Sequence, residues 1–161
     1  MNPQQLGKLT MNIELDDSLS QGPDTIKFEH DGITLYESAY NKLFSLLTSK
    51  TDKTLRITLE PGGCAGLSYK ALLDIPTDVD KVIAFDDTVK IIVSDKKRFP
   101  ADDDPSTLFS DWDFLDGLHL KFEESIMSSH FVMDNPHAVR GCSCGISFKP
   151  KGYGGKPKSC H

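Results

Sequence analysis

The sequence predicts an α+β fold that is mainly β, with one helix near its N-terminal end. Short runs with strand periodicity recur from residue 55 onward, at the close spacing typical of antiparallel sheets. One earlier run, residues 34–47, has helical periodicity instead. The chain of 161 residues suits one compact domain with terminal extensions and is too short for two ordinary domains.

Each predicted element has a local signal. Thr34 and Glu37 fit a capping box, and the apolar residues that follow predict a helix that ends before the polar turn at 51–53. Alternating apolar and polar residues then predict a strand over 55–59, which stops at the glycine-rich turn that begins at Pro61. Further strands are predicted over 67–73, 81–85, 89–93, 118–122 and 130–133.

The composition divides the chain into three parts. Residues 1–31 form a polar N-terminal extension with one candidate edge strand, residues 32–149 form the folded domain, and residues 150–161 form a flexible, basic, glycine-rich tail. Within the domain, an acidic segment after Ser94 has apolar residues that suit a short helix at 108–115. We expect this segment to cover part of the sheet.

Composition and charge exclude several classes of protein. Leu, Ile, Val and Phe make up about a quarter of the residues, more than in disordered chains. The net charge of −6 disfavours nucleic-acid partners. Uncharged stretches are about half the length of a membrane-spanning helix, so we expect no membrane partner. The acidic N-terminal residues are unlike a targeting sequence, which predicts a cytoplasmic location, or the mitochondrial matrix if a presequence had been removed.

The cysteines carry the candidate chemistry. Cys142 and Cys144 are one residue apart between glycines, so both sulfurs can turn toward one soft metal ion or cluster. Cys64 lies in a glycine-rich turn whose backbone N–H groups can hydrogen-bond to sulfur. Without a metal, the pair would be ordinary thiols on one strand face and Cys64 a small apolar residue in a tight turn. Because Cys64 is far from the pair in sequence, only the fold can bring the three together.

Other motifs are weaker. Asp111–Asp116 imitates a calcium loop, but Leu115 occupies the position of an oxygen ligand. Asp102–Asp104 is interpreted as a solvated loop, and His137 as a turn residue. Zinc-protease and serine-hydrolase motifs do not occur, and we do not expect the protein to be an enzyme.

Three motifs occur in a specific order along the chain. They are Gly-Gly-Cys-Ala-Gly-Leu-Ser-Tyr at 62–69, Asn-Pro-His at 135–137, and Cys-Ser-Cys-Gly-Ile-Ser-Phe at 142–148. Together they resemble the A-type iron-sulfur carrier family, also described as HesB-like or iron-sulfur cluster assembly accessory proteins. The helix after residue 34 and the Asp-Gly-Leu-His-Leu run at 116–120 extend the resemblance to about residues 33–149.

The resemblance implies a compact HesB-like β-sandwich or barrel of about seven strands with one N-terminal helix. It implies a carrier that binds a [2Fe-2S] or [4Fe-4S] cluster, or iron, through three cysteines, here Cys64, Cys142 and Cys144. It also implies a homodimer or higher homo-oligomer, a scaffold or glutaredoxin donor, and apo iron-sulfur proteins as recipients. Clusters normally take four thiolates, and two chains that meet at a two-fold axis can supply the missing one.

The chain departs from the family pattern at three places. Ser143 stands between the paired cysteines where the family usually has glycine, and the segment from 94 to 112 is longer than usual. Cys160 lies in the tail, where it is a candidate accessory ligand, although an exposed thiol without a role is commoner.

Three alternatives use the same thiols. A structural zinc module would close a tetrahedral site with all four cysteines. A ferrous iron chaperone would bind iron without sulfide. A dithiol redox switch would cycle Cys142 and Cys144 without metal, although a disulfide between residues i and i+2 is strained.

Overall fold

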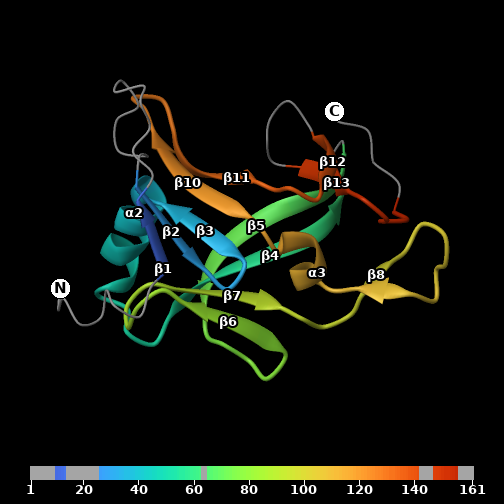
Figure 1. The fold of residues 1–161 in the computed structure, drawn as a ribbon, viewed down its shortest axis with the longest axis horizontal. Helices are drawn as coiled ribbons and strands as arrows, with labels where there is room; N and C mark the ends of the chain where they lie inside the picture. Colours follow the sequence, from blue (N-terminus) through green and yellow to red (C-terminus); the bar gives the residue numbers. More distant parts are fainter. Residues whose placement is uncertain (1–9, 14–25, 63–64, 142–146, 156–161) are drawn as a thin grey trace.

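The computed structural model of the chain describes residues 10–13, 26–62, 65–141 and 147–155. Two main sheets enclose one hydrophobic core (Figure 1). The strands are β1 (Thr10–Ile13), β2 (Ile26–His30), β3 (Ile33–Tyr36), β4 (Thr54–Gly62), β5 (Gly66–Asp74), β6 (Asp80–Ala84), β7 (Lys90–Ser94), β8 (Phe99–Pro100), β9 (Leu108–Phe109), β10 (His119–Glu124), β11 (Ser129–Asp134), β12 (Ala138–Gly141) and β13 (Ser147–Pro150). The helices of these ranges are α2 (Glu37–Leu47) and α3 (Asp111–Leu115), and neither is long and apolar enough to cross a membrane.

The first sheet has the order β1-β2-β3-β10-β11 and is covered by α2. Its strands pair antiparallel except for β3 and β10, which pair parallel. Helix α2 buries Ala39, Leu43 and Leu47, which recur at helical spacing, against this sheet. Leu35 and Leu120, which are fully buried, form part of the sheet's contribution to the core.

The second sheet has the order β12-β13-β5-β4-β7-β6 and is built around a long hairpin. Strands β4 and β5 pair antiparallel over their whole length, from Thr54 with Asp74 to Gly62 with Gly66. Alternate residues of β4, such as Ile57 and Leu59, are fully buried in the core. Strands β12 and β13 extend this sheet at the end of the molecule opposite α2 (Figure 1).

The mainly β class is confirmed, and all six predicted strand runs form strands. The described ranges contain more strands than the expected seven or so, because β1, β2 and β3 precede α2, and β8, β9, β12 and β13 are short. The strands β1 and β2 continue the first sheet, and Phe28 of β2 is buried in the core. The limit of the domain at residue 31 stays a prediction.

The predicted capping box is wrong. Thr34 lies in β3, where its backbone N–H donates to the carbonyl of Leu118, so its side chain does not cap the helix. Helix α2 begins at Glu37, and its N-cap residue, Tyr36, makes no side-chain cap hydrogen bond. Pairing of β3 with both β2 and β10 overrides the local helix signal.

The acidic segment after β7 forms the two-stranded β8–β9 sheet and α3, and α3 packs against β7, so the segment covers part of the second sheet as expected. The helix predicted over 108–115 begins only at Asp111, because Leu108 and Phe109 pair with β8. Its short helix has a true capping box, between Ser110 and Asp113. The chain after β13 packs against this segment, since Tyr153 is buried and bridges to Ala101. The described part of the predicted tail, residues 150–155, is therefore held in place, and residues 156–161 lie outside the described ranges.

Candidate metal centre

The four candidate ligands Cys64, Cys142, Cys144 and Cys160 lie outside the described residues, as does Ser143. The structure does describe the residues on either side of the two main cysteine segments. Gly62 and Ala65 flank the first segment, and Gly141 and Ser147 flank the second. The geometry of the candidate centre is therefore that of its flanks.

The first flank is the end of the β4–β5 hairpin. Gly62 and Gly66 form the last pair of the ladder, with φ angles of 136° and 128°. Such angles are open to glycine and strained for residues with a Cβ, which explains why glycine stands on both sides of the turn. Ala65 is buried, so the turn is anchored in the protein at its β5 side.

The second flank lies beside the first. Strand β13 pairs antiparallel with the beginning of β5, with Ser147 opposite Ser68 and Phe148 opposite Leu67. Gly141, the last residue of β12, is opposite Phe148. Ser68 is two residues from the start of β5, or about 7 Å along the strand. The fold thus brings the flanks of both cysteine segments to one end of the second sheet, although the segments are far apart in sequence.

An aromatic pair fixes this strand contact. The ring of Tyr69 in β5 stacks on that of Phe148 in β13, with centroids 4.4 Å apart and an interplanar angle of 7°. Burial raises the pKa of the Tyr69 phenol, so this group stays neutral at physiological pH. The stacked pair therefore gives apolar support to the two strands that flank the candidate site.

The Asn-Pro-His motif forms a turn, as predicted for His137. The amide of Asn135 donates to the carbonyl of Phe114 at 2.7 Å and accepts from the backbone N–H of His137 at 2.9 Å. The Nε2 atom of His137 lies 2.8 Å from the carbonyl oxygen of Asp116. These contacts fasten the link between β11 and β12 to the end of α3, which sequence periodicity alone did not reveal.

The described carboxylates and histidines do not form a second centre. Within the described ranges, no group of three or more His, Cys, Asp or Glu side chains is placed to hold a metal ion. Asp104 accepts hydrogen bonds from the hydroxyls of Ser106 and Thr107, which lower the pKa of its carboxyl group. Asp102–Asp104 is exposed, in agreement with the solvated loop predicted there.

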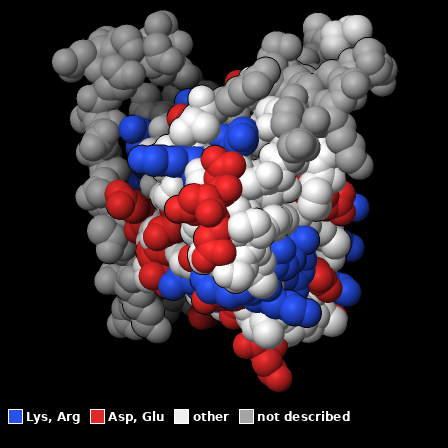
Figure 2. Space-filling model, turned by 90° about the vertical axis from the view of Figure 1, so that its right-hand side faces the viewer, with Lys and Arg blue, Asp and Glu red and all other residues white. Residues whose placement is uncertain are grey.

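Surface charge is divided on the face that carries β8. The acidic and basic side chains of the described residues form separate groups there (Figure 2). We refer to the acidic segment between β7 and β10, residues 95–118, as the inserted segment. Its exposed parts include Lys96, Lys97 and the acidic loop 102–104. Among the described residues of this face, the basic side chains form no extended track of the kind that binds a nucleic-acid backbone.

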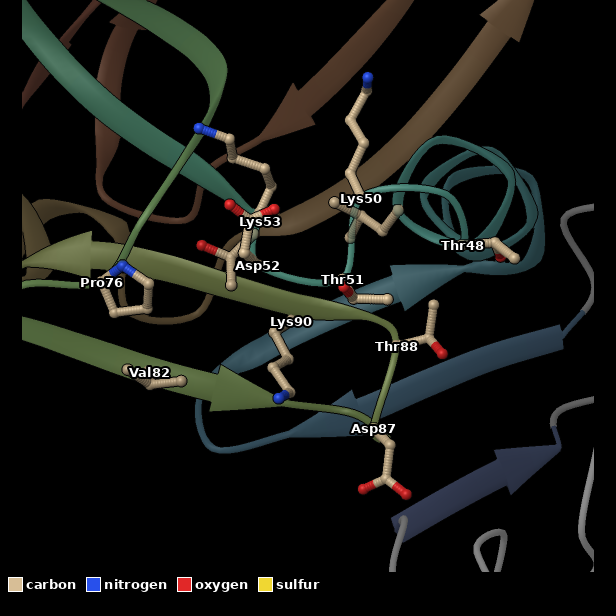
Figure 3. Close-up of a pocket in the computed structure, with 12 residues that line it drawn as sticks. Thr48, Lys50, Thr51, Asp52, Lys53, Pro76, Val82, Asp87, Thr88 and Lys90 are labelled. Carbon is tan, nitrogen blue, oxygen red and sulfur yellow. The ribbon is translucent and has the colours of Figure 1, made fainter.

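A cavity of about 230 Å³ lies at the other end of the β4–β5 hairpin. It is lined mainly by the turns at 47–54 and 87–90. The amino groups of Lys50 and Lys53 point away from that of Lys90 (Figure 3), so the three lysines do not converge on one anion. Because β4 begins at this cavity and ends at Gly62, the cavity is separate from the candidate metal centre.

Comparison with known proteins identifies the class. No family model matches the chain. Protein Rv2204c of Mycobacterium tuberculosis is 36% identical over 120 residues, which are 73% of this chain and 89% of that protein. The iron-sulfur cluster insertion protein ErpA of Histophilus somni is 30% identical over 118 residues, 72% of this chain and 92% of ErpA. The crystal structure of IscA with the [2Fe-2S] cluster matches with a TM-score of 0.54 and 22% identity, over 74% of this chain and 97% of that chain.

These likenesses show a compact, mainly β fold shared with IscA. The chain belongs to the A-type iron-sulfur carrier family. The resemblance inferred from three short motifs is thereby confirmed.

Proposed function

We propose that the protein binds an iron-sulfur cluster as cargo through Cys64, Cys142 and Cys144 and delivers it to apo-proteins, without catalysing a reaction. The pairing of β13 with the start of β5 is the observation that carries this proposal. It places the flanks of both cysteine segments at one sheet end, where three thiolates from distant parts of the chain can reach one cluster. The names of the related ErpA proteins support the same activity.

The donor set suits this cargo. Thiolates are the usual ligands of [2Fe-2S] and [4Fe-4S] clusters, and iron alone is also bound by sulfur. Three cysteines per chain leave one position open, which a second chain can fill in a homodimer or larger homo-oligomer. An open or shared position also gives an incoming thiol a place to attack, which suits receipt from a scaffold or glutaredoxin and release to an apo iron-sulfur protein.

The test is anaerobic reconstitution with iron and sulfide, followed by the visible spectrum and the quantities of iron, sulfide and zinc. We expect broad charge-transfer bands with matching iron and sulfide. Cys64→Ala, Cys142→Ala and Cys144→Ala should each abolish stable cluster binding. Cys160→Ala is the matched control, because it removes a thiol outside the proposed ligand set and should leave occupancy unchanged.

The alternatives give different outcomes in the same experiment. Full occupancy in Cys64→Ala would overturn the ligand assignment. A colourless, zinc-loaded protein that depends on Cys160 would indicate a structural zinc module. Bound iron without sulfide would indicate an iron chaperone.

A further inference from the structure

The inserted segment between β7 and β10 holds the β4–β5 hairpin at the end that carries Cys64. Within the described ranges, β4 pairs with β7 only at Leu55 and Arg56. Beyond these residues the outer edge of β4 has to find other partners, because a buried backbone group without a hydrogen bond is destabilising. Arg98 and Asp111 of the inserted segment supply them at Leu59, three residues before Gly62.

The Arg98–Asp111 pair is a closed hydrogen-bond arrangement. Asp111 Oδ2 accepts from the backbone N–H of Leu59 at 2.8 Å and from the hydroxyl of Thr58 at 3.0 Å. Arg98 donates from Nε and Nη2 to the two oxygens of Asp111, each at 2.9 Å, and Nη2 also donates to the carbonyl of Leu59. The Asp111 side chain is 0% exposed, so this carboxylate depends on these donors.

The other strand of the hairpin is held by Tyr153. A Cβ on Gly66 would lie 3.6 Å from the Tyr153 ring, so the ring packs directly against the first residue of β5. The ring is itself held edge-on by Phe99 and Phe114, at centroid distances of 5.9 and 6.1 Å. The backbone N–H of Gly154 donates to the carbonyl of Pro100 at 2.9 Å, which joins the chain after β13 to the inserted segment.

The backbones of the inserted segment and of the chain after β13 approach each other closely at Gly154. A Cβ at this position would lie 2.7 Å from the carbonyl oxygen of Ala101, a distance that real Cβ atoms do not adopt. Glycine is therefore required for the two backbones to approach. The inserted segment and the chain after β13 therefore pack together as one unit. This unit contacts β4 through Arg98 and Asp111, and β5 through Tyr153.

We propose that Arg98, Asp111 and Tyr153 are positioning residues for Cys64, which hold the two strands beside its turn and so set how readily bound cargo is released. This inference rests on the proposed function, because it concerns the same centre. Outer contacts of this kind orient metal ligands elsewhere, and their loss typically weakens binding about tenfold or more.

A second arginine cluster on the same hairpin supplies a matched control. Arg56 donates to Asp80 from Nη1 at 2.7 Å and from Nη2 at 2.6 Å, and the Asp80 side chain is also 0% exposed. This pair lies toward the other end of β4, two residues after Thr54. Asp80→Asn therefore removes a similar buried carboxylate at the far end of the hairpin, away from the ends of β4 and β5 that flank Cys64.

The experiment compares Asp111→Asn with Asp80→Asn in the full chain by two readouts. The first is the rate at which the reconstituted protein loses its cluster to an iron chelator, together with its visible circular dichroism. The second is the alkylation rate of Cys64 in the metal-free protein, with Cys142, Cys144 and Cys160 replaced by Ala. We expect Asp111→Asn to raise the rate of cluster loss about tenfold and to raise the alkylation rate of Cys64 as well. Asp80→Asn should lose comparable thermal stability and leave both rates near those of the unchanged protein.

Equal rates for the two variants would overturn the inference, because the effect would then follow stability alone. If Asp111→Asn does not fold, Arg98→Lys keeps the charge and removes the guanidinium contact with the Leu59 carbonyl, and it should raise both rates in the same direction. Failure of the unchanged protein to take up a cluster would overturn the proposed function instead. The alkylation rates would still decide whether Arg98, Asp111 and Tyr153 position Cys64, since these rates require no cluster.

Discussion

The two ends of the β4–β5 hairpin are held by arginine–carboxylate clusters of similar design and different origin. At the end away from Cys64, Arg56 binds Asp74 at 2.7 Å and Asp80 at 2.6 Å, which joins β4 to the end of β5 and the start of β6. At the Cys64 end, Arg98 and Asp111 come from the inserted segment and bind the backbone of Leu59.

The difference lies in how far along the chain the partners are. Asp74 and Asp80 are 18 and 24 residues from Arg56, whereas Asp111 is 52 residues from Leu59. The first cluster joins residues of three consecutive strands, β4, β5 and β6, so it forms together with the sheet that contains them. The second requires an added segment to fold back over a strand edge. The end that carries the candidate ligand is therefore held by contacts between residues that are far apart in the sequence.

Tyr153→Ala is expected to have the largest effect on stability. The side chain is 4% exposed and packs against Phe99, Phe114 and the backbone at Gly66, so its removal leaves a cavity. Loss of a buried aromatic ring typically costs about 3–5 kcal/mol. Denaturant unfolding of the metal-free, reduced protein measures this. Tyr153→Phe keeps the ring and serves as the control, and a similar loss in both variants would show that packing at this end is not what matters.

Asp80→Asn tests the cluster at the other end and should be pH-dependent. Hydrogen bonds from Arg56 lower the pKa of Asp80 although burial opposes this. A carboxyl group with a lowered pKa stabilises the fold fully above its ordinary pKa, and this stabilisation is lost as the pH falls through the lowered value. At neutral pH we expect the variant to lose about 1.5–3 kcal/mol, the usual range for hydrogen bonds to a charged group.

The pH dependence is measured from unfolding free energies of both proteins between neutral and acidic pH. The difference between the unchanged protein and Asp80→Asn should shrink as the pH falls below the ordinary range of aspartate. A constant difference would contradict the linkage of this ion pair to stability.

Gly62→Ala and Gly66→Ala compare the two strands beside the Cys64 turn. Both positions have positive φ, which costs about 1–3 kcal/mol for a residue with a Cβ. A Cβ at Gly62 meets nothing within 4 Å, and one at Gly66 meets the Tyr153 ring at an ordinary contact distance. We therefore expect similar losses of unfolding free energy from both variants. A much larger loss at Gly66 would show that the contact with Tyr153 is tighter than its geometry indicates.

Lys70→Ala should have the smallest effect. Lys70 pairs with Glu60 at 3.2 Å on the surface of the same hairpin, and both side chains are 55% exposed. Exposed pairs of this kind contribute less than about 1 kcal/mol. Thermal unfolding at low and high salt measures the contribution. A large, salt-sensitive loss would contradict the view that buried clusters, and not surface pairs, hold this hairpin.

Much of the fold follows from local patterns in the sequence. Alternation of apolar residues located β4 and β5, and helical spacing located α2, because each pattern reflects one buried face of one element. The helix start was misplaced because pairing of Thr34 with two neighbouring strands depends on residues distant in sequence. The short strands β8 and β12 carry too few residues for a periodic signal.

The sequence predicted which kinds of residue form the candidate site, but it did not predict which other parts of the fold lie beside them. The glycines around Cys64 indicated a ligand on a turn, and those beside Cys142 and Cys144 indicated a pair of thiols that can face one metal ion or cluster. Gly62 and Gly66 do adopt backbone angles that favour glycine. That these residues are the ligands stays a prediction. Nothing local to Asp111 or Tyr153 indicated contact with the Cys64 hairpin, because a carboxylate on a short helix and an aromatic residue in a glycine-rich stretch are each compatible with exposure.

The sequence by itself determined the main element types and the family, because these depend on residue type and short-range spacing, and it predicts the ligand chemistry on the same grounds. Only the tertiary structure decided that β13 lies beside β5 and that the inserted segment hydrogen-bonds to the backbone near the end of β4. Such neighbours are chosen by the burial of apolar faces and by the demand of strand edges for hydrogen-bond partners. Both act between residues that are far apart along the chain, so local sequence patterns do not reveal these neighbours.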